Sequence, residues 1–250
     1  MKKNISRVWA VIALKIKWSG IAVTDGRGKL GGTVFTKNRS GAAARNKVTP
    51  VNRRTSGQSY VRALLTAFSQ NWRNLTASQR AEWNTAVQNG YTTTNIFGDV
   101  VRKSGINLYC ALNIVLQIIE ETAITNVPSP DAVPAPLYRT DVLSDVSAST
   151  IFLRCDFGGV TPTVIPADTA VLMYATPKLS TGVSFVKSQL RVIGYLSAGD
   201  DTASVNVFTV YQNAFGTPAV GDNIVFAIQA VNNVSGVAGT PIQAPITIQA

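Results

Sequence analysis

This 250-residue sequence contains no histidine, and it contains cysteine only twice. The Ser-His-Asp and Cys-His arrangements of nucleophilic catalysis need a group that titrates near neutral pH, and without histidine neither can be built. Cys110 and Cys155 form no C-x-x-C pair, and they lie in segments that we assign to different domains. A zinc site or a disulfide framework is therefore not expected, and both cysteines are predicted to be buried free thiols.

Acidic residues are also scarce, and they form no pair suited to catalysis. The 13 Asp and Glu include the adjacent pairs Glu120–Glu121 and Asp200–Asp201, and neighbouring residues in a helix or a strand point apart. The glycines between Gly26 and Gly32 resemble a phosphate-binding loop only superficially, because no helix with a suitably placed Lys and Ser or Thr follows. The sequence predicts a protein that is not an enzyme and that has no cofactor and no metal ion.

No hydrophobic run is long enough to span a membrane. The run over residues 8–14 follows two lysines, as in a signal peptide, but Lys15 ends it and no small-residue cleavage site follows. Apolar residues recur at every second position up to Trp18, so residues 8–18 are expected to form a strand or an amphipathic arm. We expect no membrane partner.

Positive charge is concentrated at one end of the chain. Residues 1–62 contain 14 of the 23 Lys and Arg and a single acid, Asp25, for a net charge of +13, whereas residues 63–250 carry −3. Frequent glycines and few aliphatic residues deny this segment a core of its own. We predict that residues 1–59 form an extended basic arm held by packaged nucleic acid or by the acidic surface of a protein lattice. The alternative to a bound arm is a flexible, solvated tail.

The predicted contacts of the arm combine basic and apolar side chains. The residues expected to bind the partner are Arg27, Lys29, Val34, Phe35, Lys37, Arg39, Arg45, Lys47, Val51, Arg53 and Arg54. Modules that bind nucleic acid usually interleave aromatic residues with basic ones, but between Gly20 and Arg62 only Phe35 and Tyr60 are aromatic. A protein partner is therefore favoured, with weak, unspecific nucleic-acid contact in addition. A second copy of the chain is a further candidate partner.

Two amphipathic segments follow the arm. The first runs from Tyr60 to near Asn74, with apolar residues at helical spacing. Thr76 and Gln79 form a capping box, in which each side chain can pair with the backbone of the other residue. A second helix is therefore expected to begin at Thr76, and it is expected to end near Gly90, which suits the residue that follows a helix.

A third helix is predicted after Ser104, which can cap it. This helix is apolar on more than one face, so we expect it to pack on the first two and to close a three-helix domain over residues 60–126. Its surplus apolar face could serve subunit association. The predicted core side chains are Phe68, Trp72 and Trp83. A helix-turn-helix laid on DNA would need basic residues on the second helix, which offers only Arg80 beside Glu82.

The C-terminal half is predicted to be a separate β domain. Residues 127–137 contain four prolines and predict a stiff, extended linker. Residues 138–250 then contain strand-like runs between clusters of Gly, Pro, Asp and Asn. The predicted strands are Thr150–Phe157, Thr169–Thr176, Gln189–Leu196, Ala203–Tyr211, Asn223–Val231 and Ala244–Gln249. This number of short strands predicts an antiparallel β-sandwich, and the fold class expected for the whole chain is α+β multidomain.

The segment Gly221–Ala250 contains an alternating strand, a Ser-Gly loop and a Pro-containing run. Ile224, Phe226 and Ile228 are predicted to point inward, and the Pro-containing run is predicted to lie at a sheet edge. This segment resembles the last hairpin of a fibronectin type III-like or immunoglobulin-like domain. The resemblance implies display or contact, although a fold does not by itself define a function.

An ordered pattern also lies between Gly31 and Trp83. It includes Gly31-Gly32-Thr33-Val34-Phe35, Asn38-Arg39-x-Gly41, Thr49-Pro50-Val51-Asn52 and Gln79-Arg80-x-x-Trp83. This pattern resembles short virion structural proteins of tailed bacteriophages, particularly phages of Bacteroidetes hosts, the crAss-like group included. The resemblance implies a virion component assembled in the host cytoplasm. We expect an auxiliary or decoration protein bound to the major capsid protein, with a neck or tail protein and a DNA-binding protein as alternatives.

Overall fold

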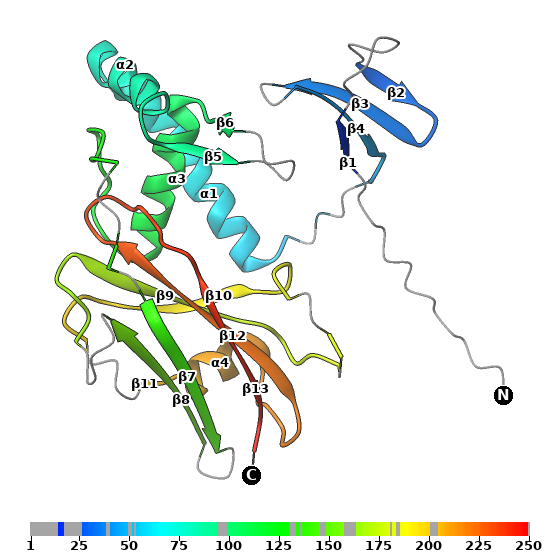
Figure 1. The fold of residues 1–250 in the computed structure, drawn as a ribbon, viewed down its shortest axis with the longest axis vertical. Helices are drawn as coiled ribbons and strands as arrows, with labels where there is room; N and C mark the ends of the chain where they lie inside the picture. Colours follow the sequence, from blue (N-terminus) through cyan, green and yellow to red (C-terminus); the bar gives the residue numbers. More distant parts are fainter. Residues whose placement is uncertain are drawn as a thin grey trace.

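The protein combines helices with several antiparallel sheets. Its computed structural model describes residues 15–17, 27–38, 41–49, 52, 54–94, 100–130, 134–135, 137–145, 149–157, 164–180, 182–183, 186–200 and 205–249. These residues contain four α-helices, and every sheet among them is antiparallel, which confirms the mixed α+β class. Figure 1 shows a group of helices, a β-rich C-terminal part beneath it and a small sheet beside both.

The small sheet is built from the segment that we predicted to be an extended arm. Its strands are β1 (Lys15–Lys17), β2 (Gly28–Leu30), β3 (Thr33–Asn38) and β4 (Gly41–Asn46), in the order β1-β4-β3-β2. Gly31 has a φ of 56°, which suits the tight turn between β2 and β3. The predicted extended arm therefore contains paired β-strands, and Lys15–Lys17 is a strand within the residues 8–18 for which a strand or an arm was expected. Backbone pairing orders them, although they have few aliphatic side chains for a core.

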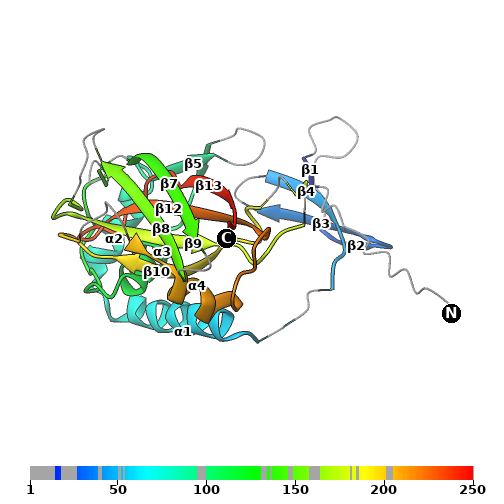
Figure 2. The ribbon, with the colours of Figure 1, turned by 90° about the horizontal axis from the view of Figure 1, so that it is seen from below.

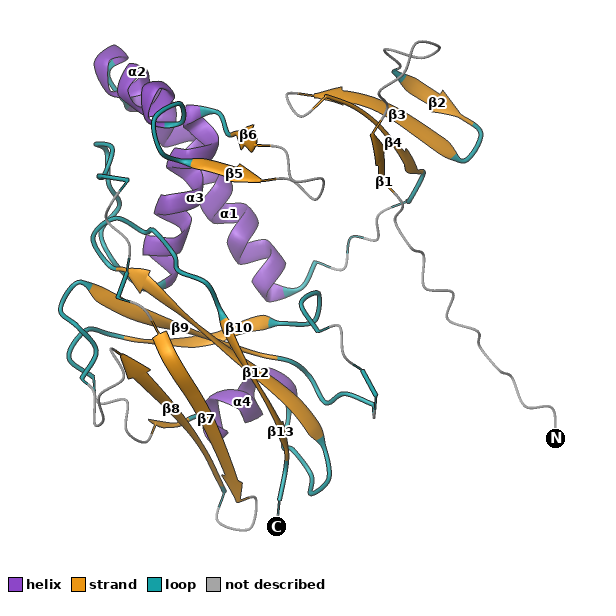
Figure 3. Ribbon diagram, in the orientation of Figure 1, coloured by secondary structure: helices purple, strands orange, loops and turns teal. Residues whose placement is uncertain are grey.

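Three α-helices and a short hairpin follow the small sheet (Figure 3). Their bounds are α1 (Ser56–Asn71), the 3-10 turn η1 (Trp72–Asn74), α2 (Ala77–Ala86), β5 (Thr92–Thr94), β6 (Val100–Arg102) and α3 (Gly105–Ile118). Helices α1 and α2 both pack on α3 around one hydrophobic cluster. The predicted three-helix arrangement is therefore present.

Two predicted helix starts are confirmed by their side-chain caps. The Thr76 hydroxyl accepts the Gln79 N–H at 3.2 Å, and the Gln79 Oε1 accepts the Thr76 N–H at 3.0 Å, which completes the capping box. The Ser104 hydroxyl accepts the Asn107 N–H at 3.4 Å and begins α3. Both helix starts could be predicted because each cap is a hydrogen bond between residues three positions apart.

Two helix boundaries differ from the prediction. Helix α1 begins four residues before Tyr60, because the Thr55 hydroxyl accepts the Gln58 N–H at 3.3 Å and caps the helix there. Helix α2 ends at Ala86, and the next four residues form a turn that ends with Gly90. Gly90 has a φ of 136°, so its conformation is not the left-handed helical one that we expected after the helix.

The C-terminal part contains two facing antiparallel sheets. Their elements are β7 (Leu137–Asp145), β8 (Thr150–Phe157), β9 (Thr169–Ala175), β10 (Arg191–Leu196), β11 (Val205–Asn206), α4 (Phe208–Phe215), β12 (Asn223–Asn232) and β13 (Ile242–Thr247). One sheet has the order β10-β9-β12-β13 and the other β11-β8-β7, and both contribute to one core. Ile224, Phe226 and Ile228 are buried in that core and β13 is an edge strand, as predicted.

The predicted strand Ala203–Tyr211 is wrong over most of its described length. Only Val205–Asn206 pairs as a strand, and the chain then enters α4. Phe208 and Tyr211 are buried and share a helical face, and the Asn206 Oδ1 accepts the Phe208 N–H at 3.0 Å. The alternation before this point resembles a strand, but burial of the aromatic face favours a helix. Strand β7, whose first residue lies in the predicted linker, has no counterpart among the predicted strands.

Helix α3 also packs directly on the outer face of one sheet. Leu116 and Ile119 are buried against residues of β9 and β12, namely Ala170, Leu172 and Val231. The surplus apolar face of α3 is therefore covered by this sheet. The helices and the sheets therefore share an interface. The division of the chain into separate domains remains a prediction.

Candidate interaction surface

Two kinds of site are absent from the described residues. Their Cys, Asp and Glu side chains form no group of three or more that could hold a metal ion, and none of their helices is long and apolar enough to cross a bilayer. Burial raises the pKa values of Cys110, Tyr109 and Tyr174, and burial together with the Asp222 carboxylate raises the pKa of Tyr211 to about 12. At neutral pH these groups stay protonated and are poor bases or nucleophiles.

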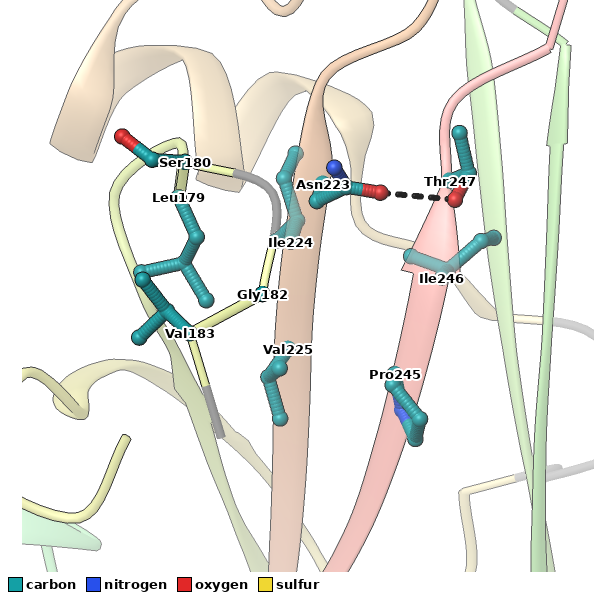
Figure 4. Close-up of a pocket in the computed structure, with 10 residues that line it drawn as sticks. All are labelled: Leu179, Ser180, Gly182, Val183, Asn223, Ile224, Val225, Pro245, Ile246 and Thr247. Atoms are coloured by element: carbon teal, nitrogen blue, oxygen red, sulfur yellow. Dashed lines mark hydrogen bonds between the residues drawn. The ribbon is translucent and has the colours of Figure 1, made fainter. Parts of the chain in front are cut away.

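One pocket of about 290 Å³ lies between β12, β13 and the segment that follows β9 (Figure 4). Its walls are mainly aliphatic, and none of the residues that line it is charged. The Asn223 Oδ1 is already occupied, because it accepts the Thr247 hydroxyl at 2.7 Å. Ligand sites combine apolar walls with several convergent polar groups. This pocket lacks that combination and is not a good candidate for a ligand site.

The small N-terminal sheet has a row of basic residues on one face. Lys29 pairs with Val34, Val34 with Arg45, and Arg45 with Lys15, in four successive strands. Directly opposite residues share a face of a sheet, so Lys29, Val34 and Arg45 lie on one side, with Lys15 at the next position of the same row. The neighbouring row contains Phe35 and belongs to the other face. Lys29 and Arg45 therefore lie on the same face of the sheet, on either side of Val34.

Most of the predicted contact residues lie on or beside this sheet. Arg39, Val51 and Arg53 lie outside the described residues, and the other eight are described. The exposed ones are Arg27, Lys29, Lys37, Arg45, Lys47 and Arg54. Val34 and Phe35 are partly buried and lie on opposite faces. The structure thus places Lys29 and Arg45 on the face of Val34, and Lys37 on the opposite face with Phe35.

The three predicted helical core residues converge on a fourth residue, Tyr109 of α3. The ring centroids of Phe68, Trp72 and Trp83 lie 6.2, 5.6 and 5.4 Å from that of Tyr109. Phe68 and Trp83 meet it edge to face, an arrangement that aromatic rings favour. Phe68 and Trp83 are buried and Trp72 is partly buried. The tryptophans therefore pack around Tyr109 and not only against each other.

Side chains of the helical unit also bind the chain that leaves α3. Trp83 Nε1 donates to the Thr125 carbonyl at 2.9 Å, and the Tyr91 hydroxyl donates to the Pro128 carbonyl at 3.0 Å. The start of the predicted linker, at Val127 and Pro128, therefore lies against the helical unit, whereas Ala135 packs on the core of the two sheets. Asn113 of α3, which the sequence did not single out, also binds the chain that leaves α3, because its side-chain amide is hydrogen-bonded to the backbone of Ile124. A polar residue within an apolar helix is a typical signal of a buried group with satisfied hydrogen bonds.

A comparison with protein-family models gives no match for this chain, and a search of curated proteins finds no significant relative. The function proposed below therefore depends on the chemistry of the chain and on the resemblance described above.

Proposed function

We propose that the protein is a non-enzymatic structural component of a tailed-phage virion. In this proposal it is an auxiliary or decoration protein, its basic N-terminal segment binds the capsid lattice, and its β-rich C-terminal part projects outward or bridges neighbours. The observation that carries the proposal is the small N-terminal sheet, which presents a row of cations and lies beside the rest of the molecule in both ribbon views (Figures 1 and 2).

The positive charge of residues 1–62 is compensated by a single acid, Asp25. Residues 26–81 contain 11 Lys and Arg and no Asp or Glu. Lys29 and Arg45 are exposed and share one face of the sheet. An acidic surface laid against this face would form charge-assisted hydrogen bonds with both. The sheet is therefore suited to binding an anionic partner.

The strand order supports a finer proposal, a sandwich of the immunoglobulin or fibronectin type III class. If β7, β8 and β11 are taken as strands A, B and E, then β10, β9, β12 and β13 correspond to C′, C, F and G. The A, B and E strands form one sheet and the other four form the second, as expected for that class. The edge position of β13, with Pro245 in it, limits pairing with other chains.

Two alternatives use the same basic surface. A neck or tail protein would bind a different acidic surface of the particle by the same contacts. A DNA-binding protein would use the cations for phosphates, but of the exposed residues in the basic segment that the structure describes only Tyr60 is aromatic, and base stacking needs such side chains. Of these, the acidic surface of the capsid is the partner we favour.

Attachment to particles at different salt concentrations tests the proposal. Phosphate binding should collapse between about 50 and 200 mM salt, because counterion release dominates it. Attachment to particles emptied of DNA should persist in high salt, because apolar contacts add a salt-insensitive contribution. Loss of the protein from washed empty particles, or tight binding of one DNA sequence at physiological salt, would replace this proposal with the DNA-binding alternative.

A further inference from the structure

Helix α1 carries an apolar stripe that is covered along only part of its length. Phe68 and Trp72, in its last turn and just beyond, pack on Tyr109. Tyr60, Val61 and Leu65 continue the same stripe at helical spacing, but their exposed fractions are 50%, 45% and 48%, compared with 4% for Phe68. The three residues belong to none of the hydrophobic clusters of the described chain.

The charged residues near this end of α1 in the sequence have one sign. Arg62 is exposed and lies in the same turn of α1 as Val61 and Leu65. Its Nη1 donates to the Asn52 Oδ1 at 2.9 Å. Exposed Arg54 lies just before the helix. No acidic residue occurs between positions 26 and 81. The result is an apolar centre with a cationic border, which is the composition of a protein-protein contact with an apolar core and a polar rim.

We propose that the patch formed by Tyr60, Val61 and Leu65, with Arg62 at its border, is a docking surface for an acidic protein surface of the particle. The partner would present an apolar groove flanked by carboxylates, into which an exposed helix face fits. This inference rests on the proposed function and adds a second contact to the N-terminal sheet.

Two other occupants fit less well. A second copy of the chain, packed through the same patch, would bring two cationic borders together, and like charges across an interface oppose association. Nucleic acid would find the cations but little to stack on, because Val61 and Leu65 are aliphatic. Charge complementarity together with aliphatic contact area therefore favours an acidic protein surface.

Co-sedimentation of the full-length chain with DNA-free capsid shells of its own phage tests the patch. The V61S/L65S variant should bind at least about tenfold more weakly than the wild type, because two apolar anchors lose their burial. Both side chains are about half exposed, so the variant should keep the wild-type melting temperature. V220S/V234S is the matched control, since Val220 and Val234 are 60% and 69% exposed on the β-rich part. It should bind like the wild type.

The charged border is tested by Arg62→Glu. This variant should weaken binding strongly at about 50 mM salt and much less at about 500 mM, because salt screens exposed charges. The defect of V61S/L65S should persist at both concentrations.

The outcomes separate the two proposals. If the wild type binds shells and V61S/L65S binds equally well, the patch proposal is overturned and the proposed function stands. If V61S/L65S changes the oligomeric state of the protein and leaves shell binding intact, the acidic partner is wrong and a second copy is the occupant. If the wild type does not bind shells, the capsid proposal fails, and the patch proposal that depends on it fails too.

Discussion

The side-chain amide of Asn113 forms two hydrogen bonds with the backbone of Ile124, one to its N–H and one to its carbonyl, as the backbone of a neighbouring β-strand would. Its Oδ1 accepts the Ile124 N–H at 2.7 Å, and its Nδ2 donates to the Ile124 carbonyl at 3.2 Å and to the Tyr109 carbonyl at 3.0 Å. Asn113 is fully buried and Ile124 is partly buried, so water has little access to these bonds. This one side chain joins α3 to the segment that leads to the β-rich part.

Replacing Asn113 with Leu should destabilise the protein by about 2–4 kcal/mol, because the Ile124 N–H and carbonyl lose their partner where water has little access. Chemical denaturation measures the change in the free energy of unfolding. Asn107→Leu, at an exposed position of the same helix, is the matched control and should change stability by less than about 0.5 kcal/mol. Equal effects of the two substitutions would show that the paired amide adds nothing.

Trp83→Ala should cost about 3–5 kcal/mol, since it empties a fully buried site and removes the bond to Thr125. Trp83→Phe should cost less, because it keeps a ring beside Tyr109. Helix α3 packs on β9 and β12, so the β-rich part should lose stability in the same transition. Hydrogen exchange of β12 in the alanine variant reports on this coupling. Unchanged protection of β12 would mean that the two parts unfold independently.

Gly236→Ala should destabilise the contact between α3 and the β12–β13 connection. Gly236 has a φ of +71°, and a Cβ there would lie 2.5 Å from the Leu112 carbonyl oxygen. We expect a loss of about 2–3 kcal/mol from strain and displacement together. Gly199→Ala is the control, because Gly199 has a φ of +85° and open space around it, so that variant measures strain alone. Similar melting temperatures for both variants would argue against a tight contact at Gly236.

Alkaline pH should destabilise the protein through Tyr211. This side chain is 2% exposed, and its pKa is raised from 10 to about 12 in the folded state. The folded state therefore favours the neutral phenol. The stability that this adds is fully present below about pH 10 and is lost as the pH rises toward 12, with a size on the order of 2 kcal/mol. Tyr211→Phe should flatten this part of the profile when unfolding free energies are compared at pH 8 and about pH 11.5. Parallel profiles would exclude the assignment.

Local patterns predicted the elements better than they predicted how the elements pack. The starts of α2 and α3 follow from the side chains of Thr76 and Ser104, because a cap acts within a few residues. Strand β8, Thr150–Phe157, was predicted with its observed bounds. The first half of α4 was predicted as the end of a strand, because its helical conformation depends on burial of Phe208 and Tyr211 in a core built by distant strands.

The candidate surface was only partly predictable for the same reason. The count of charged residues along the sequence identified the basic segment. The row that joins Lys29, Val34 and Arg45 depends on strand register, which composition does not determine. The exposed end of α1 was likewise not predicted. Helical spacing shows that Val61 and Phe68 share a face, but it cannot show that α3 covers one and not the other.

The contact between α3 and the sheet bears on how such proteins could exchange parts by recombination. A break at the prolines would separate Leu116 and Ile119 from Leu172 and Val231 and leave apolar surface on both fragments. A crossover upstream of α3 would keep these residues together, and the incoming piece would then need to match the hydrophobic cluster that α1 and α2 form with α3 and the hydrogen bonds to Thr125 and Pro128. An exchange that keeps this interface intact would therefore transfer the chain from Ser104 through β13 as one piece.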